Sequence, residues 1–319
     1  MNLERARVNL ERALELAERG RGNTYPNPIV GAVLVRDGEV VGEGWHQRKG
    51  EAHAEVIALE AAGDRARGAT LFVTMEPCTH HGSTPPCTDA VLAAGVAKVV
   101  AGSLDPNPAA QGGLEVLRKA GVEVEHANSF AARAQNEAWR TWVASTRPFV
   151  ILKLALTVDG RVATPGARWV SGEEARRRVH ELRAQVDAVA VGMGTVRADE
   201  PQLTARDVGA ERQPRRFAFG RGPLPVRSEL ELRSGSLADE LAAIAAEGVQ
   251  SLLLEGGPTL AASFLRADFV DKVLLFVAPR LAGSGALFAP ELPAPIELSH
   301  LAAEHVGDDL LLSGYVHEP

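Results

Sequence analysis

The feature that most constrains the fold is an alternation of helix-like and strand-like segments that is interrupted and restarts near residue 147. In some segments apolar residues recur at helical spacing, and in others they form short runs typical of strands. Before the interruption the pattern predicts helices at 3–17, 53–62, 87–94, 114–120 and 129–144, and strands at 29–35, 39–44, 69–74, 98–101 and 122–125. The first two strands are joined at Asp37-Gly38, a hairpin signal. Such alternation indicates an α/β layer structure.

The second half repeats the alternation after Arg147-Pro148, because proline ends the preceding helix. It predicts strands at 149–156, 188–191, 216–219, 252–255 and 272–277, helices at 173–183, 237–246 and 259–267, and a hairpin at 296–316 that turns at Gly307-Asp308. A chain of 319 residues also has the length of two domains of roughly 150 residues each. We therefore expect one α/β domain at 1–146 and a second at 147–319.

The charge balance excludes some classes of partner. The chain has 41 acidic and 34 basic residues, a formal net charge of −7. A protein whose main partner is nucleic acid needs clustered Lys and Arg, so this balance argues against one, although a local basic pocket can still bind a small anion. No apolar run approaches the roughly 18 residues that span a membrane, and the charged N-terminus lacks the apolar core of a secretion signal. We expect a cytoplasmic protein without a nucleic-acid or membrane partner.

The strongest chemical signal is His53-Ala54-Glu55 followed by Cys78 and Cys87. In a reducing cytosol a close pair of cysteines is more often a metal site than a disulfide. A catalytic zinc takes three nitrogen or sulfur ligands and a water. Cys87 begins a predicted helix, where the positive end of the helix dipole favours a thiolate. His53, Cys78 and Cys87 are therefore the predicted ligands of one Zn²⁺ per chain.

Glu55 is predicted to act beside the metal rather than to bind it. In the middle of a helix the side chains of His53 and Glu55 would diverge, but at the first turn both can point into one cleft. Glu55 would then carry a proton from the zinc-bound water, whose pKa zinc lowers to about 7, to a leaving amine. This is the division of labour in zinc deaminases, whose signature is H-x-E with P-C-x-x-C.

Three plainer interpretations stay open. His-x-Glu alone is a common pattern, and Pro77-Cys78 alone is compatible with a loop that buries a thiol. His80 or His81 as a fourth ligand would close a structural zinc site. The catalytic interpretation is favoured because a closed site leaves Glu55 without a role.

The segment from Thr74 to Cys87 carries a family resemblance. Its cysteines are separated by eight residues, and its sequence TMEPCTHHGSTPPC resembles the bacterial bifunctional diaminohydroxyphosphoribosylaminopyrimidine deaminase / 5-amino-6-(5-phosphoribosylamino)uracil reductase family. Pro26-Asn27-Pro28, Gly44-Trp45-His46 and Asp105-Pro106-Asn107-Pro108 resemble other deaminase segments of that family. The resemblance implies a cytidine-deaminase-like α/β/α domain in which Asn27 and His46 line the substrate pocket. The family usually carries a basic residue where Ser83 stands.

In the second half, Leu254-Glu255-Gly256-Gly257-Pro258-Thr259 predicts a strand, a glycine turn and a helix start. Backbone N–H groups at such a start bind phosphate, although Gly-Gly often only turns the chain. Lys153, the segment 157–161, Trp169 and the segment 191–206 resemble the dihydrofolate-reductase-like domain of the same family. The second domain is therefore expected to be a dihydrofolate-reductase-like α/β domain.

The resemblance implies two sets of residues in the second domain. NADPH would meet Ala155, Trp169, Thr195, Asp199, Gly257, Pro258, Thr259, Leu260, Ala261, Ala262 and Ser263. The substrate would meet Lys153, Ala167, Arg183, Leu203, Arg206 and Glu255. Arg183 and Arg206 suit a ribose phosphate because a guanidinium pairs with phosphate in bidentate fashion, although each alone is also compatible with solvated surface charge.

The implied function is riboflavin biosynthesis in two steps. The first domain would deaminate 2,5-diamino-6-(5-phosphoribosylamino)pyrimidin-4(3H)-one, and the second would use NADPH to reduce the ribosyl to a ribityl chain, in a homo-oligomer. An alternative keeps the deaminase and makes the second domain an inactive reductase, because Gly220 stands where the family usually has an Asp and the segment 207–250 is short for the family. A nucleic-acid-binding protein with a structural zinc is a third interpretation, which the acidic balance disfavours.

Overall fold

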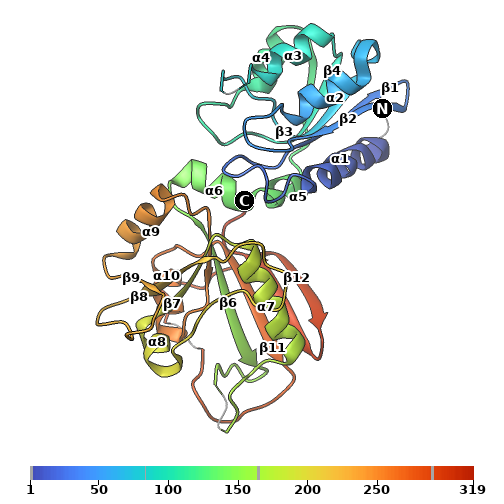
Figure 1. Cartoon of the computed structure of the whole chain (residues 1–319). Coiled ribbons are helices and arrows are strands. Elements are labelled where there is room, and N and C mark those ends of the chain that lie inside the picture. The colour runs from blue at the N-terminus through green and yellow to red at the C-terminus, as the bar shows by residue number, and fades with distance from the viewer. Residues whose placement is uncertain (1–2, 83, 164–165, 289–290) are drawn as a thin grey trace. The chain divides into compact units, whose positions relative to one another are not determined.

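The computed structural model describes residues 3–82, 84–163, 166–288 and 291–319, which form two compact units (Figure 1). The first unit comprises residues 1–145 together with Pro319, and the second comprises residues 146–318. Within the described residues, no helix combines the length and the apolar character that crossing a bilayer requires.

The first unit is an α/β/α sandwich, as expected from the sequence. Its sheet has the order β2-β1-β3-β4-β5, in which β1 is antiparallel to β2 and β3, and the remaining pairs are parallel. The strands are β1 (Gly31–Arg36), β2 (Glu39–Trp45), β3 (Thr70–Met75), β4 (Lys98–Ser103) and β5 (Glu123–His126). The helices are α1 (Leu3–Glu18), α2 (Ala54–Ala62), α3 (Cys87–Ala94), α4 (Gly113–Lys119), α5 (Phe130–Gln135) and α6 (Glu137–Ser145), with a 3₁₀ turn at Gly63–Ala66.

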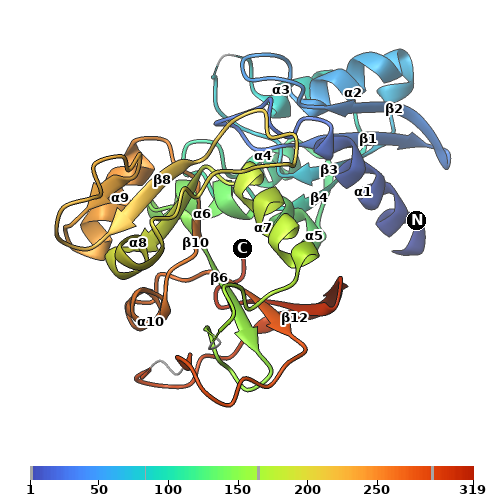
Figure 2. The same ribbon diagram turned by 60° about the horizontal axis from the view of Figure 1, so that its bottom comes forward.

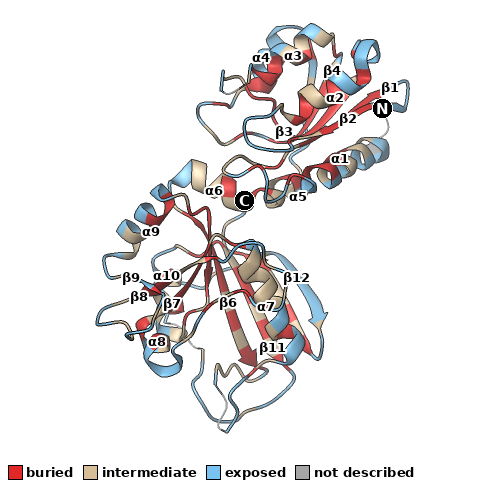
Figure 3. Cartoon of the chain, in the orientation of Figure 1, coloured by how far each residue is buried: buried red, intermediate tan, exposed pale blue. Residues whose placement is uncertain are grey.

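The alternation of side chains along β1 builds the two apolar layers of this unit. Val33 and Val35 pack with Ala13 and Leu16 of α1 on one face of the sheet. Residues of the opposite parity, such as Leu34, pack with α2, α3 and α4 on the other face. The buried strands between exposed helix surfaces are visible in Figure 3.

One predicted element of this unit is wrong. The sequence predicts a single helix at 129–144, but the structure has α5 and α6 with a break at Asn136, whose φ is −118° and ψ is 27°. The side chain of Asn136 hydrogen-bonds with the backbone of Ile29, far away in the sequence. A tertiary contact therefore overrides the local helical pattern.

The second unit is built on a sheet of order β12-β13-β11-β6-β10-β7-β8-β9. The strands from β11 to β9 in that order run parallel, and β13 and β12 extend the sheet as an antiparallel hairpin. The strands are β6 (Phe149–Thr157), β7 (Ala188–Gly192), β8 (Arg215–Phe219), β9 (Glu231–Arg233), β10 (Ser251–Leu254), β11 (Lys272–Ala278), β12 (Ser299–Val306) and β13 (Asp309–Tyr315). The helices are α7 (Glu173–Gln185), α8 (Met193–Asp199), α9 (Leu237–Ala246) and α10 (Pro258–Arg266).

The parity of β6 decides which side chains reach the site of this unit. Leu152 and Leu154 belong to the core formed with α9 and α10 on one face. Lys153 and Ala155, of opposite parity, point to the other face of the sheet. Figure 2 shows β6 together with α7 and α10 in a second orientation. The short elements α8 and β9 were not expected from the sequence.

Candidate functional site

His53, Cys78 and Cys87 come together in the first unit although they lie on separate segments. His53 is the N-cap of α2, Cys78 follows β3, and Cys87 is the first residue of α3. The Nδ1 atom of His53 lies 3.2 Å from Sγ of Cys87 and 3.6 Å from Sγ of Cys78. The backbone N–H of Cys87 donates to Sγ of Cys78 at 3.4 Å. Two helix starts thus direct one nitrogen and two sulfurs to one point.

This donor set fits a zinc ion. The three ligand atoms lie within 4.8 Å of one another, and their chemistry is the nitrogen and thiolate chemistry that zinc prefers. Neither His80 nor His81 joins the cluster, and the described residues contribute no fourth ligand to it. The fourth position is therefore available to a water or a substrate, as a catalytic site requires.

One of the two sulfurs, that of Cys78, is electrostatically prepared for metal binding, whereas the hydrogen bond with Cys78 and burial raise the pKa of the Cys87 thiol. Hydrogen bonds, first from Cys87 and then from His53, lower the pKa of the Cys78 thiol to about 4 against the effect of burial. Cys78 is therefore a thiolate at neutral pH, the form that binds metal.

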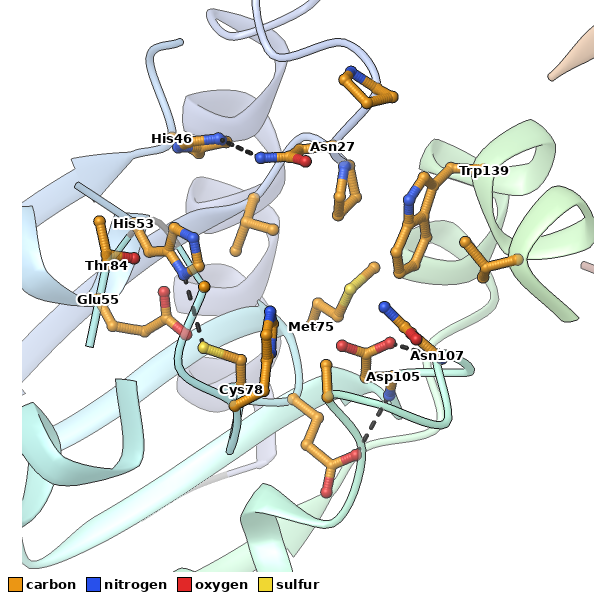
Figure 4. A pocket seen from close by; sticks show the side chains of 18 of the residues that line it. Asn27, His46, His53, Glu55, Met75, Cys78, Thr84, Asp105, Asn107 and Trp139 are labelled. Carbon is orange, nitrogen blue, oxygen red and sulfur yellow. Dashed lines mark hydrogen bonds between the residues drawn. The ribbon is translucent and has the colours of Figure 1, made fainter. Parts of the chain in front are cut away.

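Glu55 is the second residue of α2 and is only 3 % exposed. Its side chain points to the cleft that His53 and Cys78 also face (Figure 4). Burial raises the pKa of Glu55 to about 7, because the ionised form loses its hydration, while His53 opposes the rise. A carboxyl group with a pKa near neutrality can both accept and donate a proton at physiological pH.

A cavity of about 340 Å³ opens from this cluster, a size suited to a small molecule. Asn27 and His46 line it, as the resemblance implies. His46 is 3 % exposed, and burial lowers its pKa, so its imidazole is neutral at pH 7. Its Nδ1–H donates to the carbonyl of Ala52 at 3.2 Å, which leaves Nε2 to accept from the Asn27 amide at 3.3 Å. The side-chain oxygen Oδ1 of Asn27 is thereby directed to the cavity (Figure 4).

The opposite wall of the cavity contains residues that the sequence reasoning did not assign. Trp139, Asp105 and Asn107 lie there (Figure 4), and Trp142 and Val143 also line the cavity. Burial raises the pKa of Asp105 to about 6, partly offset by the Asn107 N–H, which donates to its Oδ1 at 2.8 Å. The motif 105–108 was noticed only as a family segment. The tryptophans lie in a helix whose break could not be foreseen.

The loop between the two cysteines is described except for Ser83, which lies outside the described residues. Nδ1 of His80 is buried and has no hydrogen-bond partner among the described residues. His80 also lines the cavity. Glu76, at the base of the loop, accepts the backbone N–H groups of Asp105 and Leu114 at 3.2 and 2.9 Å, which fixes the neighbouring segments.

In the second unit, the structure brings Lys153, Arg183 and Glu255 together. Two guanidinium nitrogens of Arg183, Nε and Nη2, donate to the two oxygens of the Glu255 carboxylate at 2.6 and 2.9 Å. Nζ of Lys153 lies 3.7 Å from the same carboxylate. Burial alone would raise the pKa of Glu255, but Lys153 and Arg183 lower it below its usual range. Burial lowers the pKa of Lys153, which Glu255 partly restores.

The expected phosphate ligands differ in availability. The bidentate face of Arg183 is occupied by Glu255, and its Nη1 donates to the carbonyl of Thr204 at 3.2 Å. Arg206 is exposed, and its Nη1 donates to Thr204 Oγ1 and Gln202 Oε1 at 2.8 and 3.1 Å. Leu203, with a φ of 56°, lies in the same segment. His180, which was not predicted, contacts this segment through Nδ1, 3.0 Å from the Thr204 carbonyl.

The expected cofactor residues gather at two turns. Gly192 and Gly257 are the N-caps of α8 and α10, which follow the adjacent parallel strands β7 and β10. A Cβ on Gly257 would lie 3.6 Å from Oγ1 of Thr195, so the two turns meet closely. Pro258 begins α10 and needs no hydrogen-bond acceptor there. Two helix starts at the carboxyl ends of neighbouring strands fit the pyrophosphate of a dinucleotide.

The remaining expected residues of this unit differ in exposure. Trp169 is 53 % exposed. The guanidinium carbon of Arg168 lies 5.0 Å from the centroid of its ring, and that of Arg176 lies 5.5 Å from it. Ala167 and Asp199 are also exposed, and Ala155 and Ser263 are partly buried.

Gly220 has a structural explanation in this chain. It follows β8 with a φ of 131°, and a Cβ there would lie 3.1 Å from Cγ of Met193. Its N–H donates to the carbonyl of Arg233 at 2.9 Å. An aspartate would be strained in this conformation, which glycine adopts without a steric penalty.

Comparison with known families assigns both units. Residues 4–103 match the cytidine and deoxycytidylate deaminase zinc-binding region, and residues 148–312 match the RibD C-terminal domain.

Relatives match nearly the whole chain. The riboflavin biosynthesis protein RibD of Aquifex aeolicus is 38 % identical over 94 % of this chain and 95 % of its own length. That of Escherichia coli is 39 % identical over 95 % of this chain and 97 % of its own. Among solved structures, Acinetobacter baumannii RibD is similar with a TM-score of 0.85 and 33 % identity, covering 98 % of this chain and 99 % of that one. A Thermotoga maritima diaminohydroxyphosphoribosylaminopyrimidine deaminase / 5-amino-6-(5-phosphoribosylamino)uracil reductase has a TM-score of 0.81 and 34 % identity, with the same coverage.

Proposed function

This chain belongs to the RibD family of bifunctional riboflavin-biosynthesis enzymes, and from that premise we propose that each of its units carries one activity. Residues 1–146 form the zinc-dependent deaminase domain, and residues 147–319 form the NADPH-dependent reductase domain. The substrate is 2,5-diamino-6-(5-phosphoribosylamino)pyrimidin-4(3H)-one, and the deaminated intermediate is 5-amino-6-(5-phosphoribosylamino)uracil.

The deamination consumes one water and releases one ammonia. His53, Cys78 and Cys87 hold the zinc, which when bound supplies a nucleophilic water at neutral pH. Glu55 accepts a proton from that water and delivers it to the departing amine, so the carboxyl group ends as it began. Its pKa of about 7 supports this double role, because both protonation states are populated near neutral pH.

The cavity orients the ring for this step. The side-chain oxygen Oδ1 of Asn27 accepts a hydrogen bond from an N–H group of the substrate, and His46 fixes the orientation of the Asn27 side-chain amide. The wall of Trp139, Asp105 and Asn107 receives the remainder of the substrate and reduces its contact with water.

In the reductase domain, NADPH supplies the hydride when bound. The turns at 192–195 and 257–263 hold its phosphates, and Ala155, Trp169 and Asp199 contact the rest of the cofactor. Lys153, Ala167, Leu203 and Glu255 contact the substrate. The exposed Arg206 binds its phosphate. Arg183 holds Glu255 and the carbonyl of Thr204 in place, which positions the substrate segment.

We further propose a homo-oligomer that acts in the cytoplasm on a polar, phosphorylated metabolite, with no nucleic-acid or membrane partner. The net charge of −7 supports the exclusion of nucleic acid. The open edge of β12, where Leu301 is 65 % exposed, supports association with a second copy.

The observation that carries the proposal is the cluster of His53, Cys78 and Cys87 beside the buried Glu55. The test is incubation of purified, zinc-loaded protein with the diaminopyrimidinone, with and without NADPH, followed by mass measurement of the products. The deaminated ribosyl compound is expected without NADPH, and the ribityl compound with it. Deamination without reduction would restore the inactive-reductase alternative, and an unchanged substrate would refute the proposal.

A further inference from the structure

Asn136 is a buried amide whose role none of the expected site residues accounts for. It separates α5 from α6 and is 7 % exposed. Its Oδ1 accepts the backbone N–H of Ile29 at 3.0 Å, and its Nδ2 donates to the backbone carbonyl of Ile29 at 2.9 Å. Both polar groups of one side chain are thus used on the backbone of one distant residue.

On the Ile29 side, this pair anchors the segment that carries Asn27. The backbone of Asn27 is held from the other direction, because its N–H donates to the carbonyl of Thr24 at 2.9 Å and its carbonyl accepts from Thr24 Oγ1 at 3.1 Å. His46 then fixes the side-chain amide of Asn27. The placement of the side-chain oxygen Oδ1 of Asn27 therefore depends on anchors that come before and after Asn27 in the chain.

On the helix side, the same residue sets the start of α6. The carbonyl of Asn136 accepts the N–H of Arg140 at 2.9 Å, within the first turn of that helix. Trp139 lies three positions after Asn136 and is 7 % exposed, and Trp142 lies one turn further along. Both tryptophans line the cavity, and Trp139 lies on its far side from His53 and Cys78 (Figure 4).

We propose that Asn136 is a positioning residue of the deaminase, which holds the Asn27 segment and the tryptophan wall at the separation that the substrate requires. The inference rests on the proposed deamination. Asn136 does not itself line the cavity, so it acts through Asn27 and Trp139. A purely structural role would instead lower stability and leave the kinetic constants of the folded enzyme unchanged.

The test compares Asn136→Ala with Gln135→Ala in the full-length, zinc-loaded chain. Gln135 is a matched control, because its amide also bridges distant segments, donating to the carbonyl of Leu14 and to Glu18 at 2.8 and 2.7 Å, but it does not line the cavity. Zinc content and the reductase activity of the same chain verify that each variant is folded.

Asn136→Ala is expected to lower kcat/KM of deamination about tenfold, mostly through KM, as loss of one oriented hydrogen bond to the substrate would. Gln135→Ala is expected to stay within about twofold of the parent. In an Asn27→Ala background, Asn136→Ala should lower kcat/KM by no more than about threefold further, because both changes remove the same interaction.

Kinetic constants of Asn136→Ala within twofold of the parent, or effects that multiply fully with those of Asn27→Ala, would overturn the inference. If Asn136→Ala loses zinc or the reductase activity, Asn136→Ser takes its place, because the serine hydroxyl retains one polar group near Ile29. Asn136→Ser should then lower kcat/KM of deamination more than Gln135→Ala does. A parent chain that holds zinc but does not deaminate refutes the proposed function itself, an outcome distinct from either result.

Discussion

Replacing Glu55 by Gln isolates the role of the buried carboxyl group, since the amide has the same shape but cannot exchange a proton. Glu55 is 3 % exposed and has a pKa of about 7, so the parent has a well-matched acid and base at the reacting centre. General acid–base catalysis by such a group is worth about 10²- to 10⁴-fold. Glu55→Gln is therefore expected to lower kcat of deamination by at least about 10²-fold while zinc stays bound.

The same pKa predicts an effect on stability in the zinc-free protein. Because the pKa rises from 4.5 in the unfolded chain to about 7 in the folded one, the stability that the neutral carboxyl provides is complete below pH 4.5 and is lost as the pH rises to about 7. The rise corresponds to about 3 kcal/mol. Glu55→Gln should thus stabilise the zinc-free first unit by up to about 3 kcal/mol at pH 8, and far less at pH 4.5.

The assay pairs deaminase rates and zinc content with denaturant unfolding at the two pH values. Glu51→Gln is the matched control, because Glu51 also lines the cavity but is exposed, and it should change neither rate nor stability appreciably. A Glu55→Gln enzyme with more than a tenth of the parental kcat would refute the proton-transfer role. Equal stability of parent and variant at pH 8 would refute the burial argument.

Three further predictions concern the separate activities. Cys87→Ser, or removal of zinc by a chelator, should abolish deamination and leave NADPH-dependent reduction of the deaminated intermediate intact, as measured by absorbance of NADPH; a parallel loss of reduction would contradict the assignment of zinc to one unit. Arg206→Ala should raise KM for the deaminated intermediate about tenfold, the scale of one lost charged hydrogen bond, with deamination unchanged; an unaltered KM would remove Arg206 from the phosphate site. Gly220→Asp should destabilise the second unit by more than about 1 kcal/mol in thermal unfolding without raising the reductase rate, because its backbone conformation suits glycine; a faster reductase would show that the acid is missing from this chain.

The sequence predicted those parts of the site that depend on local rules. Cys87 was expected at the start of a helix, and α3 begins there. His53 was placed near a helix cap with Glu55 in the first turn, which the structure also has. These features follow from helix-start chemistry and from spacing within one short segment, so no distant contact was needed to foresee them.

The parts that were missed depend on contacts between distant segments. The break at Asn136 is caused by Ile29, 107 positions away, and no local pattern announces it. The occupation of Arg183 by Glu255, 72 positions later, is equally invisible in the sequence, where Arg183 resembles an ordinary phosphate ligand. Helix α8 lies in a segment that was noticed only for its family resemblance, because it is too short to show a period.

The buried trio of Lys153, Arg183 and Glu255 also has an evolutionary consequence. Replacement of any one of the three leaves a buried charge without its partner. Breaking a buried ion pair in this way lowers the free energy of unfolding by about 3–5 kcal/mol. Few lineages would survive a single replacement at these positions. Among descendants of a common ancestor the three should therefore be inherited together or exchanged together, and they should appear as co-varying columns wherever one of them has changed.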